Sequence, residues 1–307
     1  MNKDIQLSVV ISAYNEEQRI GACLETVQFA QEIIVVDNES TDKTESIAKK
    51  YGAIVLSRPN NPMLNINKNF GFSKASGKWI LNLDADERVT PELAKEIQEV
   101  ISYTDKEVNG YLIPRKNIIF GKWIESEMWW PDFQLRLFQR GSGKFPEKHV
   151  HELISVDGTV EKLQDPLIHE SYNSVSSYLY KLDKIYTENE AEQIIASGKK
   201  LGWVDALRFP VNDFLKTFFL QKGYKNGLHG LVLSMLQAFY MEVVFAKVWE
   251  RQGFQEENSK TFLQDFYKEC RKILSEFRYW FLSVFMQETK SSSRKFFYRV
   301  LRKSLPK

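Results

Sequence analysis

Three carboxylates stand within four residues after the apolar segment 79–83, namely Asp84, Asp86 and Glu87. Oxygen ligands suit hard divalent cations such as Mg²⁺ and Mn²⁺, and Mg²⁺ is usually held by one or two carboxylates together with substrate phosphates. Asp84 and Asp86 lie two positions apart on a turn, so both can point towards one site, whereas Glu87 is expected only to shape the turn. The spacing alone is weak evidence, because turns after strands also collect solvated aspartates.

The elements that would position these carboxylates are short apolar runs rich in valine and isoleucine. Such runs predict strands that are buried on both faces, and they occur at 7–13, 33–37, 53–57 and 79–84. Helix-length segments at 16–30 and 41–51 separate them, and a further helix is expected with Thr90 at the N-cap and Pro91 at the first helical position. Strand and helix alternate, which predicts an α/β fold with a wound parallel sheet.

Polar residues crowd the ends of these predicted strands. In wound parallel sheets, ligands bind beyond the carboxyl ends of the strands, so the segments 13–16, 37–40, 57–59 and 84–87 form one candidate crevice. The sequence contains neither GxGxxG nor GxxxxGK[ST], which disfavours a dinucleotide-binding fold and a P-loop.

Four ordered motifs resemble those of a known family. LSVVISAYNEE, IIVVDNESTDKT, NKNFGFSKASGKWILNLDADE and WWPDFQLRLF are similar to segments of the inverting family 2 glycosyltransferases, and in detail to the bacterial branch that includes the lipopolysaccharide core heptose β-1,4-glucosyltransferases. The resemblance implies a GT-A fold, a doubly wound, mostly parallel sheet with a Rossmann-like nucleotide-binding half. It implies a catalytic domain at 1–170 and a helical region at 171–307. The motifs are specific for fold and reaction type, and they do not specify the sugar.

The resemblance also implies which residues bind the nucleotide sugar. They are Ala13, Tyr14, Glu16, Asp37, Lys68, Asn69 and Asp84. Asp37 would accept the imide N–H of uracil, and Tyr14 would pack against the base or ribose. Lys68 stands where the family usually has arginine, so the bidentate fork is lost. Tyr14 as an ordinary packing aromatic and Lys68 as a solvated helix charge are the alternatives.

A Mg²⁺ or Mn²⁺ cofactor follows from the same resemblance. Asp86 would be its main ligand, with Asp84 beside it and His151 in a supporting role, although His151 could equally be a surface histidine on a strand. The cation would neutralise the charge that builds on the departing nucleoside diphosphate.

An inverting transfer also needs a base that takes the proton from the acceptor hydroxyl. Asp132, in the segment PDFQLR, is the candidate, at the position of a family Glu-Asp motif whose first residue is here Pro131. The preceding Trp129 and Trp130 could stack on acceptor sugars or form a local aromatic core.

The charge distribution separates the last third of the chain from the rest. Residues 1–207 carry 24 Lys or Arg and 31 Asp or Glu, whereas residues 208–307 carry 18 and 9. The tail at 290–307 holds seven cations, no acid and several aromatic residues, which favours an anionic membrane surface. Nucleic acid is the rival partner, and no recognition motif supports it. The apolar run 228–249 is interrupted by polar residues, so an interfacial or core helix is expected in place of a membrane span.

Together these patterns predict a metal-dependent inverting glycosyltransferase, peripheral on the cytoplasmic side of a bacterial inner membrane. It would move a hexose, with UDP-glucose as the leading donor, to a lipid-linked glycan such as lipopolysaccharide core. One alternative is a sugar-phosphate nucleotidyltransferase, which would need a glycine-rich basic loop where this chain has SAYNEE. Another is a catalytically silent glycan-binding or scaffold protein, against which the presence of all the candidate aspartates argues.

Overall fold

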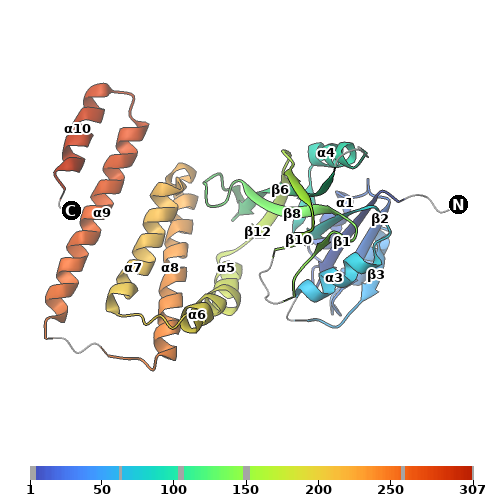
Figure 1. The fold of residues 1–307 in the computed structure, drawn as a ribbon, viewed down its shortest axis with the longest axis horizontal. Helices are drawn as coiled ribbons and strands as arrows, with labels where there is room; N and C mark the ends of the chain where they lie inside the picture. Colours follow the sequence, from blue (N-terminus) through green and yellow to red (C-terminus); the bar gives the residue numbers. More distant parts are fainter. Residues whose placement is uncertain (1–4, 62–63, 103–106, 148–152, 257–259, 306–307) are drawn as a thin grey trace. The chain divides into compact units, whose positions relative to one another are not determined.

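The structure is a computed structural model that describes residues 5–61, 64–102, 107–147, 153–256 and 260–305 (Figure 1). The chain divides into two compact units, each considered by itself. Unit 1 comprises Met1–Trp123 and Trp129–Ser171, and unit 2 comprises Ile124–Met128 and Tyr172–Lys307.

Unit 1 is built on a mixed ten-stranded sheet whose main strand order is β3-β2-β1-β4-β8-β6-β12-β5. The four predicted strands are confirmed as a parallel group: β1 (Leu7–Ala13), β2 (Glu32–Asp37), β3 (Ile54–Ser57) and β4 (Trp79–Asp84). Burial of β3 on both faces was a wrong expectation, because β3 is the edge strand and leaves Ile54 51% exposed. Ala13 lies beside Asp37 and Ser12 beside Asp84, so the strand ends adjoin.

The rest of the sheet is largely antiparallel. Its strands are β5 (Glu87–Val89), β6 (Val108–Ile119), β7 (Lys122–Trp123), β8 (Asp132–Gln139), β11 (Thr159–Lys162) and β12 (Leu167–Tyr172). β8 runs antiparallel to both β4 and β6, and β12 runs antiparallel to β5. β11 pairs in parallel with β6. A separate two-stranded ribbon joins β9 (Gly143–Lys144) and β10 (Ser155–Val156).

Helices cover both faces of the sheet in unit 1. They are α1 (Ile20–Glu25), α2 (Thr44–Lys50), α3 (Leu64–Lys74) and α4 (Pro91–Ser102). α1 and α2 are shorter than the predicted 16–30 and 41–51. The start of α4 is as predicted, because Thr90 Oγ1 accepts the Leu93 N–H at 3.1 Å.

The core of unit 1 follows from alternation along the strands. Val9 and Ile11 face a cluster with α1 and α4, whereas Val10 faces Phe72 of α3 on the other side. α3 lies so close to the sheet that a Cβ on Gly71 would stand 2.5 Å from Val10 Cγ1. Both faces are therefore fixed, which makes the strand ends rigid positions for side chains.

Unit 2 is helical from residue 175 onwards, as predicted. Its helices are α5 (Val175–Lys181), α6 (Thr187–Ala196), α7 (Trp203–Leu215), α8 (Leu228–Arg251), α9 (Phe262–Glu288) and α10 (Ser292–Lys303), with short helical turns at Leu182–Tyr186, Lys216–Leu220 and Gly223–Asn226. α8 packs against α6 and α7, and α10 folds back along α9 (Figure 1). Arg208 of α7 binds Glu269 and Glu276 of α9.

Among the described residues, α8 is the one helix that is long and apolar enough to cross a membrane, with a mean hydropathy of 1.6 over its best window. Two of its polar side chains have partners within unit 2: Gln237 donates to Asp213 at 2.9 Å, and Lys247 lies 3.0 Å from Asp183 and 3.2 Å from Glu188. These polar contacts join α8 to other helical segments of unit 2.

Candidate active site

A buried glutamate organises the turn that carries the two aspartates. Glu87 is fully buried, and its Oε2 accepts the Asp84 N–H at 3.0 Å across the turn. Its Oε1 accepts from Arg136 Nη2 at 2.6 Å and lies 3.5 Å from Arg115 Nη1. Glu87 therefore shapes the turn, as expected, and is also the anionic centre of an ion network that the sequence did not reveal.

Asp84, which closes β4, already has two cationic partners. Lys68 Nζ donates to Oδ1 at 2.6 Å, and Arg136 Nη2 donates to Oδ2 at 2.6 Å. Burial alone would favour the neutral acid, but the charges and hydrogen bonds of Arg136 and Lys68 outweigh it and hold the pKa of Asp84 well below its usual value. Lys68, predicted to bind the nucleotide sugar, thus forms an ion pair with Asp84 in this structure.

Asp86 lies beside His169, a histidine for which no role was predicted from the sequence. His169 on β12 places Nε2 3.6 Å from Asp86 Oδ2, and both side chains are 14% exposed. The pairing of β12 with β5 sets His169 opposite Glu87, next to the turn. Arg19 Nη1 is 4.0 Å from the same Asp86 oxygen.

The tautomer of His169 follows from its other contact. Nδ1 is 2.6 Å from Oδ1 of Asn117, a buried residue of β6. The amide of Asn117 is oriented by its Nδ2, which donates to the Trp129 carbonyl at 2.9 Å and to Asp132 Oδ2 at 3.2 Å. Oδ1 must therefore accept and Nδ1 carries a proton, which leaves Nε2 as the ring nitrogen that faces Asp86.

A carboxylate oxygen and an imidazole nitrogen 3.6 Å apart are a suitable ligand pair for Mn²⁺ or Mg²⁺. Within the described residues no group of three or more His, Cys, Asp or Glu side chains gathers at one point. A cation held by this pair would keep further positions for substrate phosphates and water. His151, the predicted supporting ligand, lies outside the described residues, as do His149 and Glu152.

Asp132, the candidate base at the start of β8, is held by several donors. Its Oδ2 accepts from Arg115 Nε at 2.9 Å and Nη2 at 2.6 Å, and its Oδ1 accepts from Gln134 at 2.8 Å. Burial opposes ionisation, but the charge of Arg115 and the hydrogen bonds from Gln134 and Asn117 lower the pKa of Asp132 below its usual value. Asp132 is thus ionised at neutral pH and firmly oriented.

Asp37 offers a vacant acceptor at the end of β2. Its side chain is 3% exposed; Oδ2 accepts the Ser40 N–H at 3.1 Å, whereas Oδ1 has no hydrogen-bond partner among the described residues. A buried carboxylate oxygen without a partner is costly, so it calls for a ligand donor. Tyr14, at the end of the neighbouring strand β1, is 43% exposed.

The remaining predicted residues make structural contacts. Ala13 is buried and accepts the Asn38 N–H through its carbonyl, and Glu16 donates its N–H to Thr44 at 2.8 Å. Asn69 uses both ends of its amide on the backbone of Phe145, each at 2.9 Å.

The two tryptophans predicted to bind acceptor sugars are half-buried. The Trp129 carbonyl accepts a hydrogen bond from Asn117, and Trp130 packs edge-to-face on Trp123 with ring centroids 5.5 Å apart.

Four residues of this site were missed as functional in the sequence: Arg115, Asn117, Arg136 and His169. A signal was present, because charged or amide side chains inside apolar strands such as RKNII and FQLRLF are unusual unless paired. Finding their partners required the strand pairing.

Comparison with known proteins agrees with this geometry. Residues 8–155 match the family model described as glycosyl transferase family 2. A lipopolysaccharide core biosynthesis glycosyltransferase, LpsC of Rhizobium meliloti (strain 1021), is 29% identical over 259 residues, covering 82% of this chain and 94% of its own. An uncharacterized glycosyltransferase of Rickettsia typhi is 30% identical over 257 residues, covering 80% of this chain and 87% of its own.

Two solved structures are also similar. TarS residues 1–349 of S. aureus in complex with UDP aligns with a TM-score of 0.44 and 15% identity over 83% of this chain and 95% of that chain. Glucosyl-3-phosphoglycerate synthase of Mycobacterium tuberculosis, in complex with Mn²⁺, UDP and glucosyl-3-phosphoglycerate, aligns with a TM-score of 0.31 and 25% identity over 37% and 44%.

The protein is a glycosyltransferase with a GT-A type fold. In particular, the chain belongs to glycosyltransferase family 2 and is related to an enzyme of lipopolysaccharide core biosynthesis.

Proposed function

We propose that this chain is a divalent-metal-dependent, inverting hexosyltransferase that uses a UDP-sugar, with UDP-glucose as the leading donor. Its acceptor is a lipid-linked glycan such as lipopolysaccharide core. The observation that carries the proposal is the pairing of Asp86 Oδ2 with His169 Nε2 at 3.6 Å, at the same sheet edge as the vacant Oδ1 of Asp37.

The donor nucleotide would bind at the ends of β1 and β2. Asp37 Oδ1 accepts the uracil imide N–H, which satisfies the buried oxygen, and the exposed ring of Tyr14 packs on the base or ribose. Asp84 is neutralised by Lys68 and Arg136, so we assign it to the ribose or to a metal-bound water.

Asp86 and His169 would hold the cation, with Asn117 fixing the imidazole from behind. When bound, Mn²⁺ or Mg²⁺ supplies Lewis-acid stabilisation of the leaving diphosphate.

Asp132 would take the acceptor proton. As the acceptor oxygen bonds to the anomeric carbon, the bond from that carbon to the diphosphate breaks, UDP leaves, and the hydroxyl proton passes to the Asp132 carboxylate. Arg115, Asn117 and Gln134 keep the carboxylate ionised and aimed. Because the acceptor oxygen becomes acidic as it bonds, a base of low pKa suffices late in the step.

We further propose that the enzyme is peripheral on the cytoplasmic side of the inner membrane. The support is α10, which exposes Phe296, Phe297 and Val300 at 66%, 58% and 49% amid the cations of the tail. Removal of residues 290–307 is expected to shift the protein from membranes to the soluble fraction, and an unchanged distribution would overturn this location.

The test of the transferase uses purified protein, Mn²⁺ and a panel of nucleotide sugars. We expect metal-dependent binding of UDP by calorimetry and slow hydrolysis of one donor without acceptor. Asp86→Asn and His169→Ala should each abolish both signals, whereas Asp157→Asn, at an exposed carboxylate outside the site, should leave them unchanged. Absence of UDP binding with either metal contradicts the proposal.

A further inference from the structure

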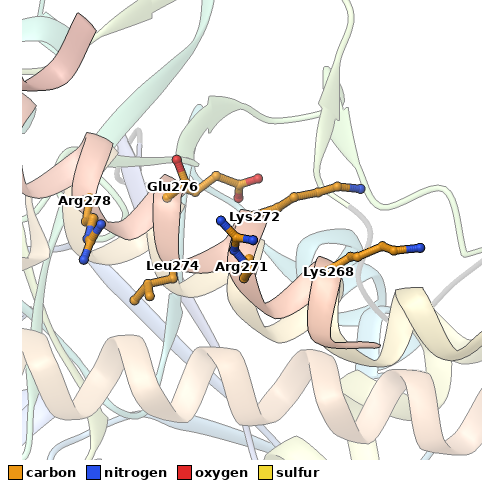
Figure 2. Close-up of a pocket in the computed structure, with 7 residues that line it drawn as sticks. Lys268, Arg271, Lys272, Leu274, Glu276 and Arg278 are labelled. Atoms are coloured by element: carbon orange, nitrogen blue, oxygen red, sulfur yellow. The ribbon is translucent and has the colours of Figure 1, made fainter. Parts of the chain in front are cut away.

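A basic cavity lies along α9 in unit 2. It has a volume of about 490 Å³, and four of the seven side chains that line it are cationic: Lys268, Arg271, Lys272 and Arg278 (Figure 2). Figure 2 shows these side chains spread along one stretch of the helix. None of these residues belongs to the proposed transferase site.

The charge in this cavity is not balanced. Glu276, its one carboxylate, is already bound to Arg208 through both oxygens, at 2.7 and 2.8 Å. Lys268 and Lys272 pair with acids of their own helix, Asp265 and Glu269. The structure records no acidic partner for either Arg271 or Arg278 within its described ranges.

The two arginines have the spacing of a two-point anion site. Seven residues are about two helical turns, so Arg271 and Arg278 share one face roughly 10 Å apart along the axis. Each guanidinium presents a planar fork that matches two phosphate oxygens.

In the first half of α9 the same face is apolar and exposed. Leu263, Tyr267 and Leu274 follow at helical spacing and are 76%, 62% and 56% exposed. Phe281 and Phe285 continue this stripe at 44% and 46% exposure, where they pack against Phe219 and Tyr298. A soluble anion needs no apolar surroundings, whereas a lipid phosphate at the bilayer surface lies next to acyl chains. A long helix with an aromatic stripe beside arginines is the composition of an interfacial helix.

We infer that α9 lies in the membrane interface and that Arg271 and Arg278 each bind the phosphate of an anionic lipid head group. This inference rests on the proposed peripheral location and deepens it: the contact extends from the tail to a specific site on α9. The apolar stripe enters the acyl boundary, while the arginine forks reach the phosphates above it.

The experiment measures cosedimentation of the full chain with vesicles of phosphatidylcholine, with and without phosphatidylglycerol, at one ionic strength. The double variant Arg271→Gln/Arg278→Gln should bind phosphatidylglycerol vesicles about 30-fold more weakly, from about 1 kcal/mol per charge near the surface. The control Lys200→Gln/Lys216→Gln removes two exposed charges of unit 2 that lie outside α9 and should lose less than threefold, which is about 0.6 kcal/mol for both charges together.

A second variant separates recognition from folding and from net charge. Arg271→Lys/Arg278→Lys keeps the charge and loses the forks, so it should bind between the wild type and the glutamine variant. Equal losses in the control and in the glutamine variant would mean unspecific attraction and would overturn the site. Tighter binding of a DNA duplex than of vesicles would overturn the lipid as occupant. If the wild type binds no vesicle, both this inference and the peripheral location are contradicted. The transferase proposal is tested separately, by metal-dependent UDP binding.

Discussion

The replacement Glu87→Gln tests whether the buried carboxylate holds the site together. Glutamine keeps the shape of the side chain but removes a charge that faces Arg136 Nη2 at 2.6 Å and Arg115 Nη1 at 3.5 Å in a fully buried position. Removing one partner of a buried ion pair typically costs 3–5 kcal/mol, because the other charge is left uncompensated. Arg136 keeps Asp84 as a partner, so we expect the low end, about 3 kcal/mol of unfolding free energy.

The assay is urea-induced unfolding, with the transition of unit 1 assigned by amide hydrogen exchange in β1 and β4. The surface variant Glu99→Gln on α4 serves as a control and should change the free energy by less than about 0.5 kcal/mol. A double-mutant cycle of Glu87→Gln with Arg136→Met should show a coupling of about 1–3 kcal/mol. A loss below about 1 kcal/mol for Glu87→Gln, or no coupling, would refute the view that this pair organises the turn.

Three further predictions follow from burial and capping. The pKa values of Asp84 and Asp132 are lowered in the folded state. The stability that these two carboxylates contribute to the fold is therefore complete above the unfolded pKa of about 3.9 and is lost as pH falls towards the folded values. Asp132→Asn should flatten the acid limb of a plot of unfolding free energy against pH, and an unchanged limb would contradict this. Burial raises the pKa of the Cys23 thiol, so a thiol reagent should modify only the partly exposed Cys270 in native protein and both cysteines in urea. Rapid modification of both cysteines in the native protein would refute this prediction. Thr90→Ala should cost about 1 kcal/mol in urea unfolding through loss of the cap of α4, and Thr90→Ser should restore most of it.

The parallel half of the sheet could be predicted because its signals are local. Each of β1, β2 and β4 is one apolar run, and the Thr90-Pro91 start of α4 depends on adjacent residues. The edge position of β3 could not be predicted, because exposure depends on whether a further strand pairs beside it.

The ion network depends on long-range pairing. β8 lies beside β4, with Leu81 opposite Leu137, although more than fifty residues separate them in sequence. This register brings Arg136 to Asp84 and Glu87. No spacing rule in the sequence states which strand will follow β4 in the sheet, so the partner of an arginine inside FQLRLF could not be named.

The position of His169 could not be predicted for a related reason. The register of β12 on β5 places His169 opposite Glu87, and this pairing has no local signal in the sequence. The candidate base and the candidate metal ligand are also joined through a side chain with no sequence signature, because Asn117 donates to Asp132 and accepts from His169.

The two aspartates of the turn differ in their electrostatic surroundings, although they are only two residues apart. Asp84 faces Lys68 and Arg136 at 2.6 Å each, so its charge is already compensated before any ligand arrives. Asp86 Oδ2 lies 3.6 Å from the imidazole nitrogen of His169 and 4.0 Å from Arg19 Nη1. A cation approaching Asp84 would meet two positive charges at close range, which makes Asp84 a poor primary ligand. Glu87 supports the arrangement at Asp84, since it binds the same Arg136 nitrogen that binds Asp84 and fixes the turn through the Asp84 N–H.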